Sequence, residues 1–358
     1  MAFKLSPGSS ILLDLIRGVS SQAVLVGHAM IIFDVFEYFH YPKIQNIAVL
    51  IFFLLSGFLI TYSTFRKDNY SFRDYFIDRF SRIYTAFVPA IIFVLLCDSL
   101  NNYLNPDLYA YTSAFDITTL FGNLLMLQDF PVFEIFEGFN VTSFGSARPF
   151  WTLAIEWWIY MFFGYIFLAS KNNNAFLWLI LIKCSIVPLF NFIGGRGNGL
   201  TLYWIFGAAV YFSLKSWNIS KHSKKNIISI AAFLVIVALL RLYVVKEEYD
   251  PIFALCITGI FGISIYAFQN RNFTKLAGQI IKLNADYSFT LYLIHYSILI
   301  FLFNTFNQTV NSYVLFFGAV VLSNLLSFMM AYYTELKWTR KIKVLLKNKS
   351  YRSILAFR

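Results

Sequence analysis

The sequence predicts an all-α membrane protein, a polytopic bundle of about ten transmembrane helices. Of its 358 residues, 59% are hydrophobic and only 13% are charged, so a soluble domain of this length would leave too much apolar surface in water. Its mean hydropathy is +0.64, and its apolar runs approach the roughly 20 residues that a helix needs to cross a bilayer. The basic residues cluster at alternate ends of these runs, as the positive-inside rule requires.

Ten apolar runs are the expected crossings. They cover residues 13 to 33, 45 to 65, 83 to 100, 150 to 169, 175 to 191, 200 to 214, 227 to 245, 251 to 268, 288 to 304 and 313 to 333. If the N-terminus is cytoplasmic, the basic residues of the outer segments are only Lys43, Arg148, Arg196, Arg241 and Lys246. We therefore expect both termini in the cytoplasm, and we attribute the net charge of +11 to membrane orientation and not to a nucleic-acid surface.

The longest segment between the expected crossings, residues 101 to 149, falls on the outer side. Its middle, ITTLFGNLLMLQDF at residues 117 to 130, is apolar but too short to cross, which favours a re-entrant or interfacial helix. We expect one transmembrane domain over residues 1 to 340 and a basic cytoplasmic tail over residues 341 to 358.

The first apolar run carries three ionisable side chains, Asp14, Arg17 and His28. A helix turns about 100° per residue, so all three fall within one narrow sector of its surface. The rise of about 1.5 Å per residue separates Arg17 from His28 by roughly 16 Å along the helix. Because charged groups inside a membrane are costly and usually functional, this stripe predicts a polar path through the bilayer.

Two further motifs lie around the cytoplasmic end of the second and third runs. Ser56 and Gly57 interrupt the second run, as either a notch for close helix packing or part of a site. Arg79 and Arg82, three residues apart in RFSRIY, can grip a phosphate together, or they can anchor the helix to lipid headgroups.

Glu156 stands alone in the fourth run, with Trp151 near its start. Glu156 and His28 lie at similar distances from the outer ends of their runs, so the two side chains can pair. A carboxylate beside an imidazole orients it as a base. The alternative is that each side chain only hydrogen-bonds another helix.

Tyr292 and His295 lie three residues apart on the ninth run, in SFTLYLIH. Nothing in this spacing assigns proton transfer to His295, so we expect it to support the site or the structure. The sequence has no GxSxG elbow, no Walker loop and no metal-ligand spacing. These absences argue against a serine hydrolase, an ATPase and a zinc enzyme, and no metal is expected.

Taken in order, LDLIRGVSSQAVLVGH, FFLLSGFLI, RFSRIY, WTLAIEWWIY and SFTLYLIH closely resemble the serial motifs of the acyltransferase type 3 family. Its members are O-acyltransferases of the bacterial inner membrane that modify surface polysaccharides such as the O-antigen of lipopolysaccharide. The resemblance covers the chain from Leu13 to about Tyr333. It implies an acyl-coenzyme A donor, usually acetyl-coenzyme A, reached from the cytoplasm. The acceptor it implies is a sugar hydroxyl on a polysaccharide or its lipid-linked precursor.

The resemblance also implies roles for individual residues. His28 matches the catalytic histidine and Glu156 the fourth-motif glutamate, while Arg17, Arg79 and Arg82 match the family's arginines and are expected to hold the donor's phosphates. Asp14, Ser56, Trp151, Tyr292 and His295 are expected to support the site or bind substrate.

The expected reaction has two forms that the sequence leaves open. Either His28, oriented by Glu156, removes the acceptor's proton while Ser56 or a backbone amide stabilises the oxyanion, or His28 itself forms an acyl-imidazole. A rival function is a transporter or flippase of lipid-linked saccharides, in which the same buried charges line a passage. Coenzyme A binding distinguishes the enzyme from the transporter. A purely structural scaffold is disfavoured by the four polar insertions in apolar helices.

Overall fold

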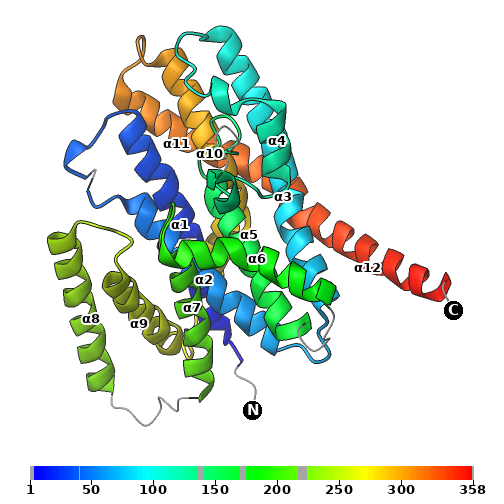
Figure 1. Ribbon diagram of the computed structural model, residues 1–358. Helices are drawn as coiled ribbons and strands as arrows, with labels where there is room; N and C mark the ends of the chain where they lie inside the picture. The colour runs from blue at the N-terminus through cyan, green and yellow to red at the C-terminus, as the bar shows by residue number, and fades with distance from the viewer. Residues whose placement is uncertain (1–3, 40, 136–140, 170–174, 217–223, 357–358) are drawn as a thin grey trace. The chain divides into compact units, whose positions relative to one another are not determined.

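The computed structural model describes residues 4–39, 41–135, 141–169, 175–216 and 224–356, and within these ranges it contains helices and no strands (Figure 1). Each of the ten expected runs coincides with a helix. These are α1 (Pro7–Ile32), α2 (Ile44–Phe65), α3 (Phe72–Leu104), α5 (Phe150–Gly164), α6 (Ala175–Ile193), α7 (Leu200–Ser216), α8 (Lys224–Val245), α9 (Pro251–Ala267), α10 (Lys275–Phe306) and α11 (Ser312–Tyr333). The predicted all-α membrane class is confirmed.

Within the described ranges, seven helices are long and apolar enough to cross a membrane. They include α5 with the π-helix Tyr165–Ala169 that continues it, and α11 with the helix that follows it. The apolar part of α6 and the whole of α9 are shorter, and α7 has 17 residues. The count of ten crossings therefore stays a prediction.

The expected short helix in the long outer segment is α4, Ile117–Leu124, with eight residues. At about 1.5 Å per residue it is far too short to cross a bilayer. Its N-cap is Asp116, whose carboxylate accepts a 2.9 Å hydrogen bond from the Thr119 amide. The hydrogen bonds from Thr119 lower the pKa of Asp116, so the cap stays charged at neutral pH.

The basic C-terminal segment forms a helix, α12 (Thr339–Ala356), which follows the π-helix Thr334–Trp338 and is red in Figure 1. It contacts α3 through two lysines. Lys343 Nζ lies 2.9 Å from Asp78 Oδ1, and Lys347 Nζ lies 3.2 Å from Asp74 Oδ1. The tail thus contacts α3 at Lys343 and Lys347. The proposed domain boundary at residue 340 stays a prediction.

The chain divides into two compact units, which we describe separately. Unit 1 contains residues 1–27, 36–68 and 191–285, and unit 2 contains residues 28–35, 69–190 and 286–358.

The tightest helix contact of unit 1 joins α2 to α7. A Cβ atom on Gly57 would lie 1.9 Å from the Trp204 carbonyl oxygen, and one on Gly207 would lie 2.0 Å from that of Leu54. The two backbones therefore touch, which only glycine permits. The packing interpretation of Gly57 is confirmed.

Unit 2 buries most of α5 and the loop that precedes it. Trp158 Nε1 donates a 2.7 Å hydrogen bond to the Met126 carbonyl, and the Tyr75 hydroxyl donates a 3.0 Å bond to the Tyr160 carbonyl. Residues 143–147, before α5, are all buried. The loop therefore folds inward, and α5 begins inside the unit and not at its surface.

Candidate functional site

Two histidines from α1 and α10 meet in unit 2. His28 Nδ1 lies 3.0 Å from His295 Nε2, and the two rings stack at 17° with centroids 5.2 Å apart. His295 Nδ1 lies 2.9 Å from the Leu291 carbonyl oxygen, one helical turn earlier in α10. His295 is fully buried and His28 is half-buried.

These contacts determine which ring nitrogens carry hydrogen. A carbonyl oxygen only accepts, so the His295 Nδ1 atom must be the donor to Leu291. In neutral His295 the Nε2 atom is then an acceptor, and it receives its hydrogen bond from His28 Nδ1. His28 Nε2 is left with a free lone pair. A histidine with its tautomer and orientation held in this way is arranged to accept a proton.

One tyrosine lies against His28, and a second tyrosine bonds to the first. The ring of Tyr296 stands edge-on to the His28 ring at 87°, with centroids 5.1 Å apart. The Tyr111 hydroxyl donates to the Tyr296 hydroxyl over 3.5 Å. Burial raises the pKa of Tyr111, so it remains a neutral donor. Neither tyrosine is among the predicted site residues, although Tyr296 directly follows the motif that ends in His295.

A buried carboxylate on α3 anchors the loop before α5. Asp98 is fully buried, and its two oxygens accept hydrogen bonds from the Ser146 amide at 2.7 Å and the Ser146 hydroxyl at 2.6 Å. The Ser146 hydroxyl also lies 2.7 Å from that of Ser297 on α10. Gly145 has φ +53°, and a Cβ there would lie 2.2 Å from Asp98 Oδ2, so this turn requires glycine.

The same loop carries Arg148 to the histidine pair. Before Arg148 the loop contacts Ser297, and after it the Pro149 carbonyl accepts a 3.5 Å hydrogen bond from Tyr292. Because His295 lies between Tyr292 and Ser297 on α10, Arg148 is held beside it. Arg148 is exposed, acts electrostatically on His28, and its guanidinium has no hydrogen bond or ion pair within the described residues. In the sequence, Arg148 stands out only as one of the basic residues of the outer segments.

The expected pairing of His28 with Glu156 is wrong in this structure. Glu156 accepts a hydrogen bond from the Tyr160 hydroxyl and acts electrostatically on Tyr75, while His28 is bonded to His295. The predicted pairing places the start of the fourth run at the membrane surface. In the structure the residues before α5 are buried, so the distance from the start of the run does not give the position of Glu156 relative to His28.

Arg79 and Arg82 differ in their surroundings. The Arg79 guanidinium lies over the Tyr75 ring at 5.6 Å, and its buried Nε has no hydrogen-bond partner within the described part of the chain. Arg82 is exposed. The adjacent Asp78 is bonded to the Tyr70 hydroxyl at 2.9 Å and to Lys343 of α12. The acid nearest to Arg79 in the sequence is therefore already neutralised by the C-terminal helix.

The predicted residues of unit 1 have structural contacts. Arg17 lies 3.6 Å from Asp14, and α1 is continuous from Pro7 to Ile32, as the predicted stripe requires. Ser56 Oγ accepts a 3.2 Å hydrogen bond from Trp204 Nε1, a contact between α2 and α7.

The remaining predicted residues lie at the start of α5 and on α10. Trp151 is half-buried in the first turn of α5, and Thr152, next to it, has its hydroxyl 2.5 Å from that of Tyr292. Among the described residues, no group of three or more His, Cys, Asp or Glu side chains is arranged to hold a metal ion.

The chain is similar to known acyltransferases. An acyltransferase domain family matches residues 11–332. The chain is 30% identical over 237 residues to a protein of Shigella phage Sf6 named O-acetyl transferase, covering 61% of this chain and 67% of that relative. No solved structure gives a significant match. The chain therefore belongs to the acyltransferase family that its motifs resemble, and it is an O-acyltransferase.

Proposed function

We propose that the protein transfers an acyl group, most simply acetyl, from acyl-coenzyme A to a hydroxyl of a cell-surface polysaccharide or its lipid-linked precursor. The observation that carries this proposal is the hydrogen-bonded chain from Leu291 through His295 to His28, which leaves one imidazole nitrogen free to take a proton. The name of the phage relative, O-acetyl transferase, supports acetyl as the group transferred.

In the proposed reaction, His28 Nε2 removes the proton of the acceptor hydroxyl as its oxygen attacks the thioester carbonyl. The carbon–sulfur bond then breaks, and the coenzyme A thiolate leaves with the proton from His28. Arg148 lies beside the histidine pair and has no ion-pair partner within the described residues, so we assign it to stabilise the oxyanion of the tetrahedral intermediate. Attack by His28 Nε2 itself, through an acyl-imidazole, uses the same free lone pair.

We propose that the donor's phosphates bind at the start of α3. Arg79 offers a buried N–H that has no hydrogen-bond partner within the described residues, and Arg82 is exposed. Arg17 stays a predicted phosphate ligand. Lys343 and Lys347 keep Asp78 and Asp74 from competing for the arginines. Glu156 remains a predicted catalytic residue, but its contact with Tyr160 and its influence on Tyr75 associate it with Arg79 instead of His28.

We further propose a bacterial inner-membrane protein with ten crossings and both termini in the cytoplasm. The concentration of basic residues on one side of the predicted topology supports this orientation. Acyl-coenzyme A would then reach Arg79 and Arg82 from the cytoplasm.

The test is binding and turnover of radiolabelled acetyl-coenzyme A by the purified protein in nanodiscs. We expect His28→Ala to bind the donor normally and to lose transfer by at least about a hundredfold. Arg79→Ala with Arg82→Ala should lose donor binding. Arg73→Ala, which removes an exposed cation from the same helix, is the control and should bind as the parent does.

Two outcomes contradict the proposal. A folded His28→Ala variant with parental turnover would exclude His28 as the reacting group. If the folded parent bound no acetyl-coenzyme A, a different donor or the rival transport function would have to be considered.

For Arg148, we expect the substitution by Gln to lower kcat about tenfold. Substitution by Lys should restore most of the lost activity, since Lys keeps the positive charge.

A further inference from the structure

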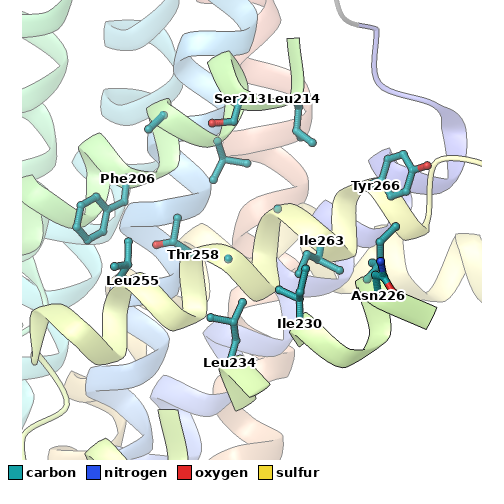
Figure 2. Close-up of a pocket in the computed structure, with 15 residues that line it drawn as sticks. Phe206, Ser213, Leu214, Asn226, Ile230, Leu234, Leu255, Thr258, Ile263 and Tyr266 are labelled. Carbon is teal, nitrogen blue, oxygen red and sulfur yellow. The ribbon is translucent and has the colours of Figure 1, made fainter. Parts of the chain in front are cut away.

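Unit 1 contains a groove that is separate from the residues assigned above. It lies among α7, α8 and α9 and has a volume of about 560 Å³, within the range of ligand sites. Figure 2 shows Phe206 of α7, Leu234 of α8, and Leu255 and Ile263 of α9 around it. These side chains make its interior almost wholly apolar.

Two glycines of α9 form part of its wall. A Cβ on Gly262 would meet Val210, another lining residue, at 3.5 Å, an ordinary contact, so a larger side chain at this position would take up space in the groove. Thr258, also in the wall, donates its hydroxyl to the Ala254 carbonyl at 2.7 Å. The interior therefore offers few hydrogen-bond partners to water.

The helix that bounds the groove is itself suited to lipid. The most apolar window of α8 is only 6% buried, with a mean hydropathy of 2.6. Ile228 and Leu239 are more than 60% exposed. In a bilayer these side chains face hydrocarbon, so a groove beside them is open to an acyl chain.

One end of the groove is polar and basic. Ser213 and Tyr266 lie there, and their hydroxyls make no hydrogen bond within the described residues (Figure 2). Lys215 follows in the last turn of α7, and Lys224 and Lys225 begin α8. The sequence has no Asp or Glu between residues 200 and 246 or between 251 and 285. The positive end of the α8 dipole adds to this charge.

We propose that this groove binds one anionic phospholipid. An acyl chain occupies the apolar interior, while the headgroup phosphate accepts hydrogen bonds from Ser213 and Tyr266 at the end of the groove where Lys215 follows the lining residue Leu214. A neutral lipid satisfies the interior equally well, but only an anionic one matches the charge at the rim. The site does not depend on the acyl-transfer proposal.

The test is native mass spectrometry of the full chain, delipidated in detergent and titrated with phosphatidylglycerol or phosphatidylcholine. We expect the parent to retain one phosphatidylglycerol with about tenfold preference over phosphatidylcholine. Gly262→Leu should fill the groove and lower that affinity at least tenfold. Gly318→Leu adds the same apolar volume on α11, where a Cβ meets nothing within 4 Å, and should bind as the parent does.

A second variant leaves the packing of the helices unchanged. Changing Lys215 to Gln should lower the preference for phosphatidylglycerol and retain binding at the level of phosphatidylcholine. Equal binding by Gly262→Leu and Gly318→Leu would mean that the retained lipid is ordinary annular lipid. Equal affinity of the parent for the two lipids would overturn the anionic assignment.

Discussion

The contact between α2 and α7 in unit 1 and the contact between α3 and α10 in unit 2 hold helices together by opposite means. In unit 1, Gly57 and Gly207 remove side chains so that two backbones touch. In unit 2, a buried carboxylate and two hydroxyls are hydrogen-bonded to one another. They belong to Asp98, Ser146 and Ser297. The first contact gains dispersion energy and leaves no polar group to satisfy.

The polar contact of unit 2 requires the burial of a carboxylate, which only complete hydrogen bonding offsets. What this arrangement provides is position: it places the loop with Arg148 beside His28 and His295. The comparison indicates that small residues stabilise this protein, whereas its buried polar groups arrange the site.

Gly57→Ala should produce the largest loss of stability. Its Cβ would lie 1.9 Å from a carbonyl oxygen of α7, which cannot move without displacing that helix. We expect a loss of at least about 3 kcal/mol, measured as a fall in Tm or in the yield of monodisperse protein. Gly318→Ala is the matched control and should leave Tm unchanged. A stable Gly57→Ala variant would contradict backbone contact between α2 and α7.

Asp98→Ala should cost about 1 to 3 kcal/mol, because the Ser146 amide loses its acceptor in a buried place. Asp98→Asn keeps an acceptor for that amide and should lose much less. Hydrogen exchange of residues 141–149 should rise in the Ala variant, and turnover should fall with it. Unchanged exchange in this loop would show that Asp98 does not anchor it.

His295→Phe should lower kcat about 10- to 100-fold and leave the KM for acetyl-coenzyme A unchanged. Phe keeps a ring against His28 but offers no acceptor to His28 Nδ1, so the tautomer of His28 is no longer held. His295→Gln offers a carbonyl oxygen and should recover part of the loss. If Phe and Gln were equally active, or if KM changed instead of kcat, His295 would have only a packing role.

Asp250→Asn should have a smaller effect than the three substitutions above. Hydrogen bonds from Arg241, at 2.6 and 3.0 Å, hold the pKa of Asp250 below its usual range. The unfolded chain binds this proton more readily, so the resulting stability is present at neutral pH and is lost as pH falls from about 4 through the lowered pKa.

Asp116 is the matched control for Asp250. Both are helix N-caps, accepting from Phe253 and Thr119 respectively, but only Asp250 has the Arg241 ion pair. Asn can serve as a cap in both places. We therefore expect Asp250→Asn to lower Tm slightly at pH 7 and not below pH 3, and Asp116→Asn to lower it less. A larger fall in Tm for Asp116→Asn than for Asp250→Asn would attribute the effect to helix capping instead of the ion pair with Arg241.

Much of the fold was predictable because hydropathy and charge are local properties of the chain. The ten helices, the short α4 and the packing role of Gly57 all follow from runs of residues read in order. The placement of Asp14, Arg17 and His28 on one helix was predictable for the same reason, since helical geometry relates neighbours in sequence without reference to other helices.

By itself, the sequence determined the membrane class, the helices, the family motifs and the residues that carry its chemistry. Only the tertiary structure decided which of those residues meet. His28 pairs with His295, and Arg148 reaches the histidines on a loop anchored by Asp98. The reason is physical: a helix's rotation and depth relative to its neighbours depend on side-chain packing and inward-folding loops, and neither leaves a periodic signal in the sequence.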